Sequence, residues 1–594
     1  MGEPLRSITI VGGGTAGWLA AAFLNRFCKS KDPKIPLEIT LIESPTIPIV
    51  GVGEASLPGM VVLLNQLGLS ESEFFKLTDA TFKVSAHFVN WNHDESGKSI
   101  EFLNILNAPG AIDGRQLADY FVTFDPARAA PDAGNAYVRA FSPVAEIVRG
   151  NLAPRRPGEP DFSGEVGYTY HFDATKLAGF LKDVATGRGV KHILDDVDEV
   201  NLDERRFVKS LSLRRQGEHA VDLVIDCTGF RGSILQQALG EPFEPYCDHL
   251  LNDRAAVLQM PHKDPSVIAP TTLATGFSAG WNFNIPLTTR VGTGYIFSSK
   301  FISDDDAKEE LLTYYGDQAK GCEPRIIPMR TGRVRNAWFK NCVALGLSGG
   351  FIEPLEATAI FMTDLGVRWL TNYLPTQDFE PELAAAYNRH VRQVYEEVRD
   401  FVQLHYHLNN RQDTDYWKAA REEMILSDRL QENLKVWQHT APEDLDLGST
   451  FLFSSPVYTL LLIAKGFYKD RRLSRAPSLS RTAYERYRTS ARKERPDQLA
   501  GLISHAEFLK TGGKAPAGAW MGQPASAGPG FRPAGTKDQA AISDAPPQHL
   551  AQEEAPLSTT RDPAPPAIGG CRTLSFSPIR RVSGRQCRAP THRL

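Results

Sequence analysis

The feature that most constrains this chain is a glycine turn between a short apolar strand and a helix, in the sequence IleThrIleValGlyGlyGlyThrAlaGlyTrpLeuAlaAlaAla at residues 8–22. Gly12, Gly14 and Gly17 fill the three glycine positions of a GxGxxG fingerprint. The first glycine permits a tight turn, the second lets the backbone approach a pyrophosphate, and the third lets the helix pack close to the strand. A turn without a ligand is the alternative interpretation. A second apolar strand ending in Glu43, where an acidic residue would hold a ribose hydroxyl, favours dinucleotide binding.

Composition and charge exclude several other classes of protein. The 594 residues are 42% hydrophobic and 23% charged, with a formal net charge of -4, so the chain lacks the basic footprint of a nucleic-acid-binding protein. No apolar signal-peptide core precedes the first strand, and no uncharged apolar run reaches membrane-spanning length. The seven cysteines are scattered and show no CxxC spacing. We therefore expect a cytoplasmic protein with reduced thiols, no metal site, and no nucleic-acid or membrane partner.

The segment at residues 79–91 has the alternation of a half-buried strand. Apolar residues alternate there with Lys83, Ser85 and His87, so the side chain of Lys83 is predicted to point away from the apolar face. Because lysines are mostly exposed, the pattern alone favours a solvated Lys83, and His87 is likewise expected on the polar face and not as a ligand. The preceding loop, residues 44–58, is either an ordinary connector or a slim lining for a flavin ring.

The middle of the chain predicts a mixture of irregular structure and strands. Residues 108–165 show little periodicity and predict a long excursion over the surface or above a site. An apolar strand then ends at Asp226 and Gly229, which is typical of the second strand and turn that approach the dinucleotide in flavoproteins. Residues 255–300 alternate as in an antiparallel sheet.

A turn rich in small residues follows at residues 344–360. Its glycines would allow the backbone to approach a ligand closely, and the start of the next helix could hold an anion. Glu353 and Glu356 are either functional or simply favourable acids in the first turn of that helix.

The order of these motifs resembles that of the flavin-dependent tryptophan-type halogenases. The motifs are GlyGlyGlyThrAlaGlyTrp at 12–18, PheLysValSerAlaHisPheValAsnTrp at 82–91, GlyTrpAsnPheAsnIlePro at 280–286, GlyTyrIlePheSerSer at 294–299, and the stretch 344–360. The resemblance covers residues 5–470. It is specific because five ordered motifs coincide where one alone would be weak.

The resemblance implies an α/β fold and a flavin cofactor. The expected core is an FAD-binding Rossmann-like domain of the p-hydroxybenzoate hydroxylase type, followed by a mostly helical substrate region. FAD would be used as FADH2 delivered by a separate flavin reductase. The candidate cofactor-binding residues are Gly12, Gly14, Thr15, Ala16, Gly17, Glu43, Val52, Gly53, Glu54, Ala55, Asp226, Gly229 and Leu347.

The same resemblance implies the chemistry. Reduced flavin and O2 would convert chloride or bromide to hypohalous acid, which would travel through a tunnel and halogenate an electron-rich aromatic such as an indole or tryptophan derivative. By position, Lys83 resembles the lysine that captures the halogen, and Glu356 resembles the neighbouring catalytic carboxylate. A lysine whose pKa is lowered by burial can hold electrophilic halogen, and a carboxylate can stabilise a cationic arene or accept its proton. The resemblance thus favours a functional Lys83 over a solvated one.

Two motifs depart from the family pattern. In the tryptophan-x-tryptophan-x-isoleucine-proline motif, thought to screen flavin from substrate, Trp281 is present but the second aromatic residue is Phe283. The usual ProLeuGluSerThrGly carries Ala357 and Ala359 at its fourth and sixth positions. Because the halide is expected near backbone amides at Thr358 and Ala359, the second departure leaves the halide preference open.

The C-terminal part divides into a helical region and a tail. Residues 1–365 are expected to form the FAD-binding core, 366–510 the helical substrate region, and 511–594 a disordered basic tail rich in Pro, Ala and Gly that can be removed without loss of folding. His405 and His407 lie two residues apart, which suits no zinc signature, so both are interpreted as structural.

Two other functions stay open at this point. A flavin-dependent monooxygenase would insert oxygen itself, and Phe283 permits that. A non-catalytic flavin-binding protein would keep the glycine loop but lose the reacting pair, which Lys83 and Glu356 argue against. The sequence leaves the substrate, the halide and the oligomeric state undetermined, with a homodimer as one option.

Overall fold

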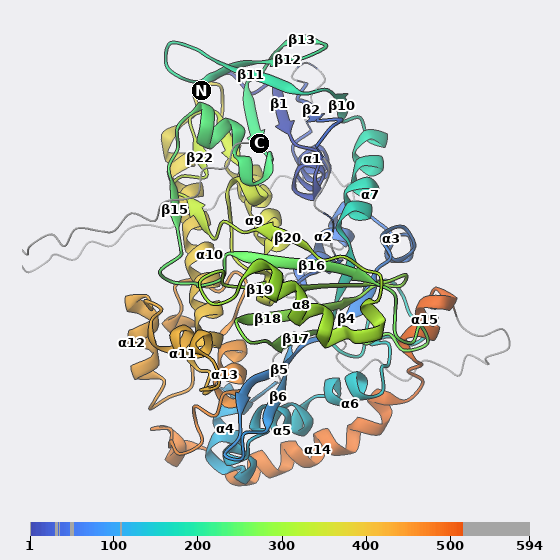
Figure 1. Ribbon diagram of the computed structural model, residues 1–594, viewed down its shortest axis with the longest axis vertical. Helices are drawn as coiled ribbons and strands as arrows, with labels where there is room; N and C mark the ends of the chain where they lie inside the picture. The colour runs from blue at the N-terminus through green and yellow to red at the C-terminus, as the bar shows by residue number, and fades with distance from the viewer. Residues whose placement is uncertain are drawn as a thin grey trace, which may run out of the picture. The chain divides into compact units, whose positions relative to one another are not determined.

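The glycine turn near the N-terminus joins a strand to a helix, as predicted. In the computed structural model, β1 (Ser7–Val11) leads into α1 (Thr15–Phe27). The structure describes residues 2–29, 34, 36–47, 51, 53–106 and 110–514, which all belong to one compact unit. Of the predicted tail, residues 515–594 lie outside the described residues, and Thr511 is the last residue of a helix. Helix α1 is buried along most of its length, and its alanines at 20–22 let it lie close to α7 (Ala174–Gly187), as Figure 1 shows.

A six-stranded, mainly parallel sheet forms the first layer. Its order is β10 (Lys191–Leu194), β2 (Glu38–Glu43), β1, β14 (Leu223–Asp226), β23 (Cys342–Ala344) and β22 (Trp338–Phe339). Strand β1 pairs in parallel with both β2 and β14, and only β22 runs antiparallel to its neighbour. Because ligands of open parallel sheets bind at the carboxyl ends of the strands, this topology places a site beside the glycine turn. The predicted α/β fold class is confirmed.

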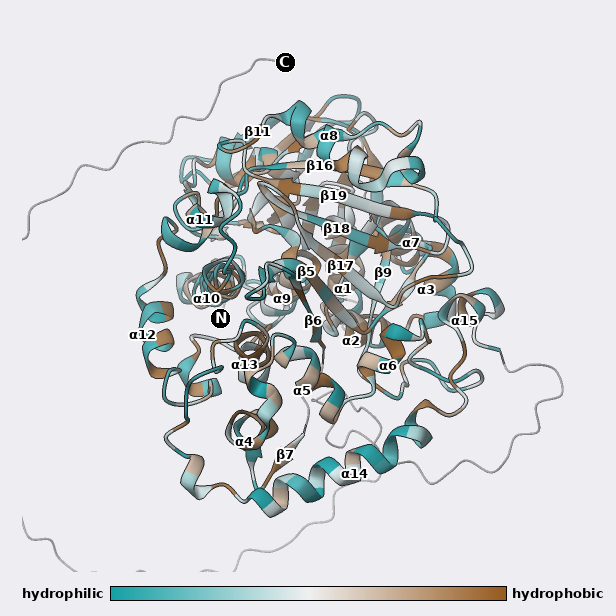
Figure 2. Ribbon diagram, turned by 60° about the horizontal axis from the view of Figure 1, so that its bottom comes forward, coloured by the Kyte–Doolittle hydropathy of each residue, from teal (hydrophilic) through white to brown (hydrophobic). Residues whose placement is uncertain are grey.

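A seven-stranded, largely antiparallel sheet confirms the strands predicted at residues 255–300. Its order is β20 (Arg325–Pro328), β16 (Arg254–Met260), β19 (Val291–Phe297), β18 (Gly280–Pro286), β17 (Thr271–Gly276), β5 (Ser85–His93) and β6 (Ser99–Ile105), and Figure 2 shows β16 to β6 in this succession. Phe283 pairs with Gly294 in the register of β18 and β19. A Cβ atom added to Gly294 would lie 2.6 Å from the Phe283 ring, so this glycine leaves the room that the ring occupies.

A small third sheet contacts strands of the seven-stranded sheet. It is built from β3 (Gly53–Ala55), β9 (Thr169–Asp173) and β4 (Thr81–Lys83), with β9 in the centre and fully buried. Both neighbours pair with β9 in antiparallel register. Strand β4 is therefore an edge strand of this sheet, and the predicted single strand at 79–91 is two strands, β4 and β5, in different sheets.

Residues 108–165 are more regular than the sequence suggests. They contain α4 (Leu117–Phe124), α5 (Ala133–Phe141) and α6 (Val144–Arg149). Each helix is under ten residues long, so each spans too few turns for a periodic pattern to stand out. Helix α5 packs against β6 and against helices from the C-terminal region, and this tertiary packing stabilises a helix too short to form alone.

The C-terminal part of the described chain is helical, as predicted. It contains α9 (Ala359–Asn372), α10 (Pro381–His407), α11 (Asp415–Glu422), α12 (Asp428–Val436), α13 (Ser455–Ala464), α14 (Arg481–Leu499) and α15 (His505–Thr511). Helix α13 is almost entirely buried, whereas α14 buries only Tyr484 and is mostly hydrophilic in Figure 2. None of the helices in the described ranges combines the length and the apolar character needed to cross a membrane.

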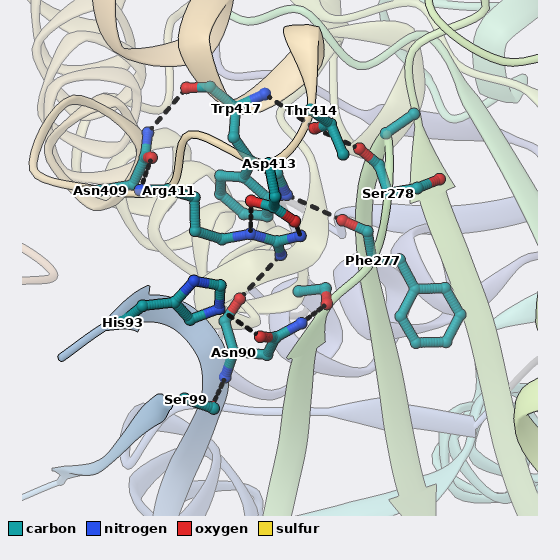
Figure 3. A network of polar contacts seen from close by, with 12 residues as sticks. Asn90, His93, Ser99, Phe277, Ser278, Asn409, Arg411, Asp413, Thr414 and Trp417 are labelled. Atoms are coloured by element: carbon teal, nitrogen blue, oxygen red, sulfur yellow. Dashed lines mark hydrogen bonds and ion pairs between the residues drawn. The ribbon is translucent and has the colours of Figure 1, made fainter. Parts of the chain in front are cut away.

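A polar network fastens the connection between α10 and α11 to the seven-stranded sheet (Figure 3). The Arg411 guanidinium pairs with Asp413 at 2.6 and 2.9 Å and donates to the backbone oxygen of Asn90 at 2.9 Å. Trp417 donates from Nε1 to the oxygen of Phe277 at 2.8 Å. Because these bonds satisfy backbone groups at the irregular part of β5 and just after the end of β17, they hold the helical region in a defined place on the sheet.

Candidate active site

A cavity with a volume of about 1170 Å³ lies at the carboxyl ends of the parallel strands. Ten of the predicted cofactor residues line it: Gly12, Gly14, Thr15, Ala16, Glu43, Gly53, Glu54, Ala55, Gly229 and Leu347. Lys83, Phe283 and Ala359 also contribute to its wall. The cavity therefore joins the glycine turn to the residues expected to act on halogen.

Gly17 and Asp226 lie behind the cavity wall, and Val52 lies outside the described residues. A Cβ atom at Gly17 would be 1.9 Å from the oxygen of Gly12, so this glycine permits the close packing of α1. The Asp226 carboxylate accepts hydrogen bonds from the backbone N–H groups of Thr228, Ile234 and Leu235 at 2.9 to 3.0 Å. Its observed contacts thus hold the turn after β14.

The glycine turn has the shape that a dinucleotide requires. Gly12 has a φ of +123°, and a Cβ atom there would lie 2.2 Å from the oxygen of Cys227. A Cβ atom on Gly14 would meet no protein atom within 4 Å, so it faces open space in the cavity. Glu43 ends β2 beside this turn, with its Oε2 2.9 Å from His192 Nε2. A constrained first glycine, an open second glycine and an acid at the next strand end fit FAD.

Replacing Gly14 by alanine tests this fit. Gly14 has ordinary extended backbone angles and its added methyl group meets no protein atom, so the protein should fold normally. The methyl group should fill space reserved for the pyrophosphate and weaken FAD binding by about tenfold or more. Equilibrium titration with FAD, beside a thermal melt, measures both effects. Gly179→Ala in α7, also without a close neighbour, is the control, and unchanged FAD affinity in Gly14→Ala would contradict the assignment.

Glu54 is a polar member of the cavity wall in β3. Loss of hydration raises the pKa of its carboxyl to about 7. The wall therefore carries a carboxyl group that exchanges a proton near neutral pH.

Lys83 is buried, contrary to the expectation from strand alternation alone. It is 2% exposed, and its strand β4 pairs along one edge with β9 and lies near the start of β17. Its Nζ donates to the oxygen of Ser56 at 3.1 Å. Burial lowers the pKa of Lys83 to about 8, and the Glu356 carboxylate opposes that shift by favouring the charged form. His87, in contrast, is half-buried and meets Glu101 at 2.8 Å, as predicted for the polar face.

Glu356 is also buried and lies outside the first turn of α9, which begins at Ala359. It is 5% exposed and accepts a hydrogen bond from Asn104 Nδ2 at 2.9 Å. His405 Nε2 lies 2.8 Å from the same oxygen, without the alignment of a hydrogen bond. Burial lowers the pKa of His405, while Glu356 acts in the opposite direction. The interpretation of Glu356 as a simple first-turn acid is therefore wrong.

Glu353 forms a second buried centre on the same segment. It is 1% exposed, and its Oε2 accepts hydrogen bonds from Trp281 Nε1 at 2.9 Å, Asn252 Nδ2 at 2.8 Å and Tyr406 Oη at 2.8 Å. Burial raises the pKa of Glu353, opposed by these three donors. The end of α10 thus contacts both glutamates through consecutive residues: His405 lies beside Glu356, and Tyr406 donates to Glu353.

The two aromatic residues of the expected flavin screen differ in position. Phe283 lines the cavity, whereas Trp281 is 1% exposed and lies behind it, with 6.2 Å between the ring centroids. The hydrogen bond to Glu353 fixes the Trp281 ring. Phe283 is therefore the one of the pair that faces the cavity.

The expected halide residues lie at the start of α9. Ala359 lines the cavity, and the buried Thr358 hydroxyl has no hydrogen-bond partner within the described part of the chain. Ala357 has a φ of +57°, a left-handed conformation that is uncommon for a residue with a Cβ atom. This conformation ends the short helix that carries Glu356 and starts α9.

Several contact residues were not predicted from the sequence. Asn104, Asn252 and Tyr406 gave no recognisable signal, because each is an ordinary polar or aromatic residue whose partner is more than 50 positions away. His405 is predicted from its spacing to be structural, and the structure places its ring 2.8 Å from Glu356. No group of three or more potential metal ligands occurs within the ranges that the structure describes.

The parallel sheet and the glycine turn at its carboxyl edge define an α/β fold of the dinucleotide-binding class. A sequence model of the tryptophan halogenase family matches residues 7–478. Tryptophan 6-halogenase SttH of Streptomyces toxytricini is 36% identical over 478 residues, covering 77% of this chain and 88% of the relative. Tryptophan 7-halogenase RebH of Lentzea aerocolonigenes is 34% identical over 452 residues, covering 74% and 83%.

Solved structures agree with the sequence relatives. The crystal structure of SttH matches with a TM-score of 0.79 at 34% identity, covering 85% of this chain and 99% of that one. BrvH, a flavin-dependent halogenase from a Brevundimonas species, matches with a TM-score of 0.74 at 33% identity, covering 86% and 99%. The chain belongs to the tryptophan halogenase family, whose members here are flavin-dependent enzymes.

Proposed function

We propose that this protein is a two-component, FADH2-dependent halogenase that uses O2 and chloride or bromide to halogenate an electron-rich aromatic, such as an indole or tryptophan derivative. The observation that carries the proposal is Lys83, a buried amine in the wall of the cavity that also contains the glycine turn. Its pKa of about 8 leaves part of it neutral near neutral pH, which is what nucleophilic capture of halogen requires.

The cofactor side would be held by the glycine turn and its neighbours. The turn from Gly12 to Ala16 would hold the pyrophosphate, Glu43 the ribose, and Gly53 to Ala55 with Leu347 the flavin end. When bound, reduced flavin supplies the oxidising chemistry with O2 that turns halide into hypohalous acid. The start of α9 at Thr358 and Ala359 would bind the halide, since the first amides of a helix favour an anion.

Lys83 would then take up the halogen. The neutral Nζ attacks the halogen atom of hypohalous acid, an N–halogen bond forms, the halogen–oxygen bond breaks, and water leaves with the displaced proton. The hydrogen bond to Ser56 holds Nζ in place for this reaction. Transfer of the halogen to the arene returns the amine, and the arene loses one proton.

Glu356 would act at the arene. Its carboxylate, held by Asn104, stabilises the positive charge that develops on the ring and accepts the ring proton. Phe283 and Trp281 would separate the flavin side from the arene, which disfavours direct oxygen insertion. In the same proposal residues 1–365 form the FAD-binding core, and residues 366–510 contribute the substrate side, from which His405 already reaches Glu356.

The test is turnover with a separate flavin reductase. The purified protein should need added FAD and should not oxidise NADH by itself, because the sequence carries one dinucleotide fingerprint and no second. With reductase, NADH and an indole panel, the products should gain the mass of chlorine or bromine according to the salt supplied. Rapid NADH consumption by the protein alone would contradict the two-component assignment, and oxygenated products regardless of halide would favour a monooxygenase.

A further inference from the structure

The strand that carries Lys83 has one edge completed by a side chain instead of another strand. Strand β4 pairs with β9 on one side. On the other side, Val84 donates directly to the oxygen of Pro270 at 2.8 Å, but Phe82 N–H donates to His505 Nε2 at 3.0 Å. His505 Nδ1 lies 3.1 Å from the oxygen of Ile268. The imidazole ring thus fills the gap between β4 and the segment that leads into β17.

These contacts determine the state of the imidazole. Because Nε2 accepts from a backbone N–H, the ring must be neutral and its proton must lie on Nδ1, which donates to Ile268. His505 is fully buried, and burial lowers its pKa to about 4. The ring therefore keeps the same hydrogen bonds throughout the neutral pH range.

Helix α15 is firmly attached where it presents His505. The backbone N–H of His505 donates to Asn151 at 2.7 Å, and Ala153 donates to Ile503 at 3.0 Å. Phe508 on the same helix packs edge-to-face on Phe82, with ring centroids 5.4 Å apart. Two residues of α15 therefore contact the residue directly before Lys83.

We propose that His505 is a positioning residue for Lys83, through the hydrogen bond that fixes Phe82 and with it the buried edge strand. The proposal rests on the halogen-capturing role of Lys83. Helix α15 lies beyond residue 478, where the family match ends, so this contact adds an element from the end of the described chain to the candidate active site.

The physical argument concerns the hydration of Lys83. Without an acceptor, a buried N–H would be left unpaired, and β4 would be expected to move or admit water to satisfy it. Water near Nζ would weaken the desolvation that depresses the Lys83 pKa. At a pH below the pKa, a rise of about one pKa unit would lower the fraction of neutral amine about tenfold. The rate of halogenation would fall by the same factor.

The experiment measures Lys83 directly in the full-length protein. Acylation of Lys83 by acetic anhydride, followed by peptide mass spectrometry from about pH 6 to 11, gives its titration curve. His505→Leu and His505→Met should move the titration midpoint of Lys83 toward 10.5, the ordinary lysine value. Both should lower halogenation by about tenfold at neutral pH, and part of the activity should return at higher pH. His505→Gln, which offers an amide acceptor and donor, should retain the wild-type curve. Glu507→Gln, exposed on the same helix, is the matched control.

Each outcome supports or overturns the proposal. Variants that lower the melting temperature but leave the Lys83 titration unchanged would show that His505 is merely structural. If the apolar variants do not fold, a folded His505→Gln protein whose Lys83 titrates near 10.5 would still overturn the proposal. The acylation curve does not depend on halogenation, so it tests only the role of His505. A failure of the proposed function would be seen in a different experiment, as halogenation by the Lys83→Ala variant.

Discussion

Lys83→Ala should yield no halogenated product although it still binds FAD. The substitution removes the only amine that the structure places in the cavity wall among the described residues, so hypohalous acid would have no group to capture and orient it. Oxidation of reduced flavin by O2 should persist, because it takes place at the cofactor. Product mass analysis measures halogenation, and stopped-flow absorbance of the flavin measures its oxidation separately.

Two further variants control this experiment. Lys83→Arg should not restore activity, because a guanidinium stays charged and is a poor nucleophile. Lys98→Ala, which removes an exposed lysine from the turn between β5 and β6, should halogenate normally. A Lys83→Ala enzyme that halogenates at the wild-type rate would refute the assignment of Lys83.

The pH dependence gives an independent check on the same residue. The pKa of Lys83 is depressed to about 8, so the protonated form dominates below that pH and the neutral form above it. The Lys83-dependent step should therefore accelerate as the pH rises through about 8 and then level off. A rate of halogen transfer that is flat across this range would contradict capture by the neutral amine.

Glu356→Gln should slow halogen transfer by about 10²-fold or more. The amide keeps the size of the side chain and can still meet Asn104, but it carries no charge to stabilise the cationic ring and accepts a proton poorly. FAD affinity should be nearly unchanged, since Glu356 does not line the cofactor cavity. Single-turnover product formation beside an FAD titration distinguishes the two effects.

The control for Glu356 is Glu309→Gln, on an exposed position of α8 (Asp304–Tyr315). This variant should lose neither activity nor stability, because surface substitutions have small effects. An equal, slight loss in both variants would mean that Glu356 serves only the fold. A specific loss in Glu356→Gln would support its part in the chemistry.

Local patterns were enough to predict the strand, glycine turn and helix at the start of the fold. Gly12, Gly14 and Gly17 lie within six positions of each other, and the backbone demands of a strand, a turn and a helix act over that same short distance. The antiparallel strands at 255–300 were predicted for the same reason, because alternation reports directly on a sheet with a buried face.

The burial of Lys83 was decided by tertiary structure. Alternation predicts which side of a strand a residue is on, but not whether something covers that side. Here the Lys83 ammonium meets the backbone oxygen of Ser56, 27 positions away, while β9 and His505, the latter 423 positions from Phe82, complete the two edges of β4. Only the ordered motifs shared with halogenases pointed to a functional lysine, and they carried no information about its surroundings.

The partners of Glu356 and Glu353 were decided in the same way. Asn104 and Glu356 are 252 positions apart, and Asn252 and Glu353 are 101 apart, so no spacing rule connects them. The pKa of a buried group depends on how much water reaches it and on the charges beside it, and residues that are distant in the sequence set both. The sequence by itself therefore determined the class of fold and the residues able to react, whereas only the packed structure decided which of them are desolvated and held, because desolvation is a property of the assembled core.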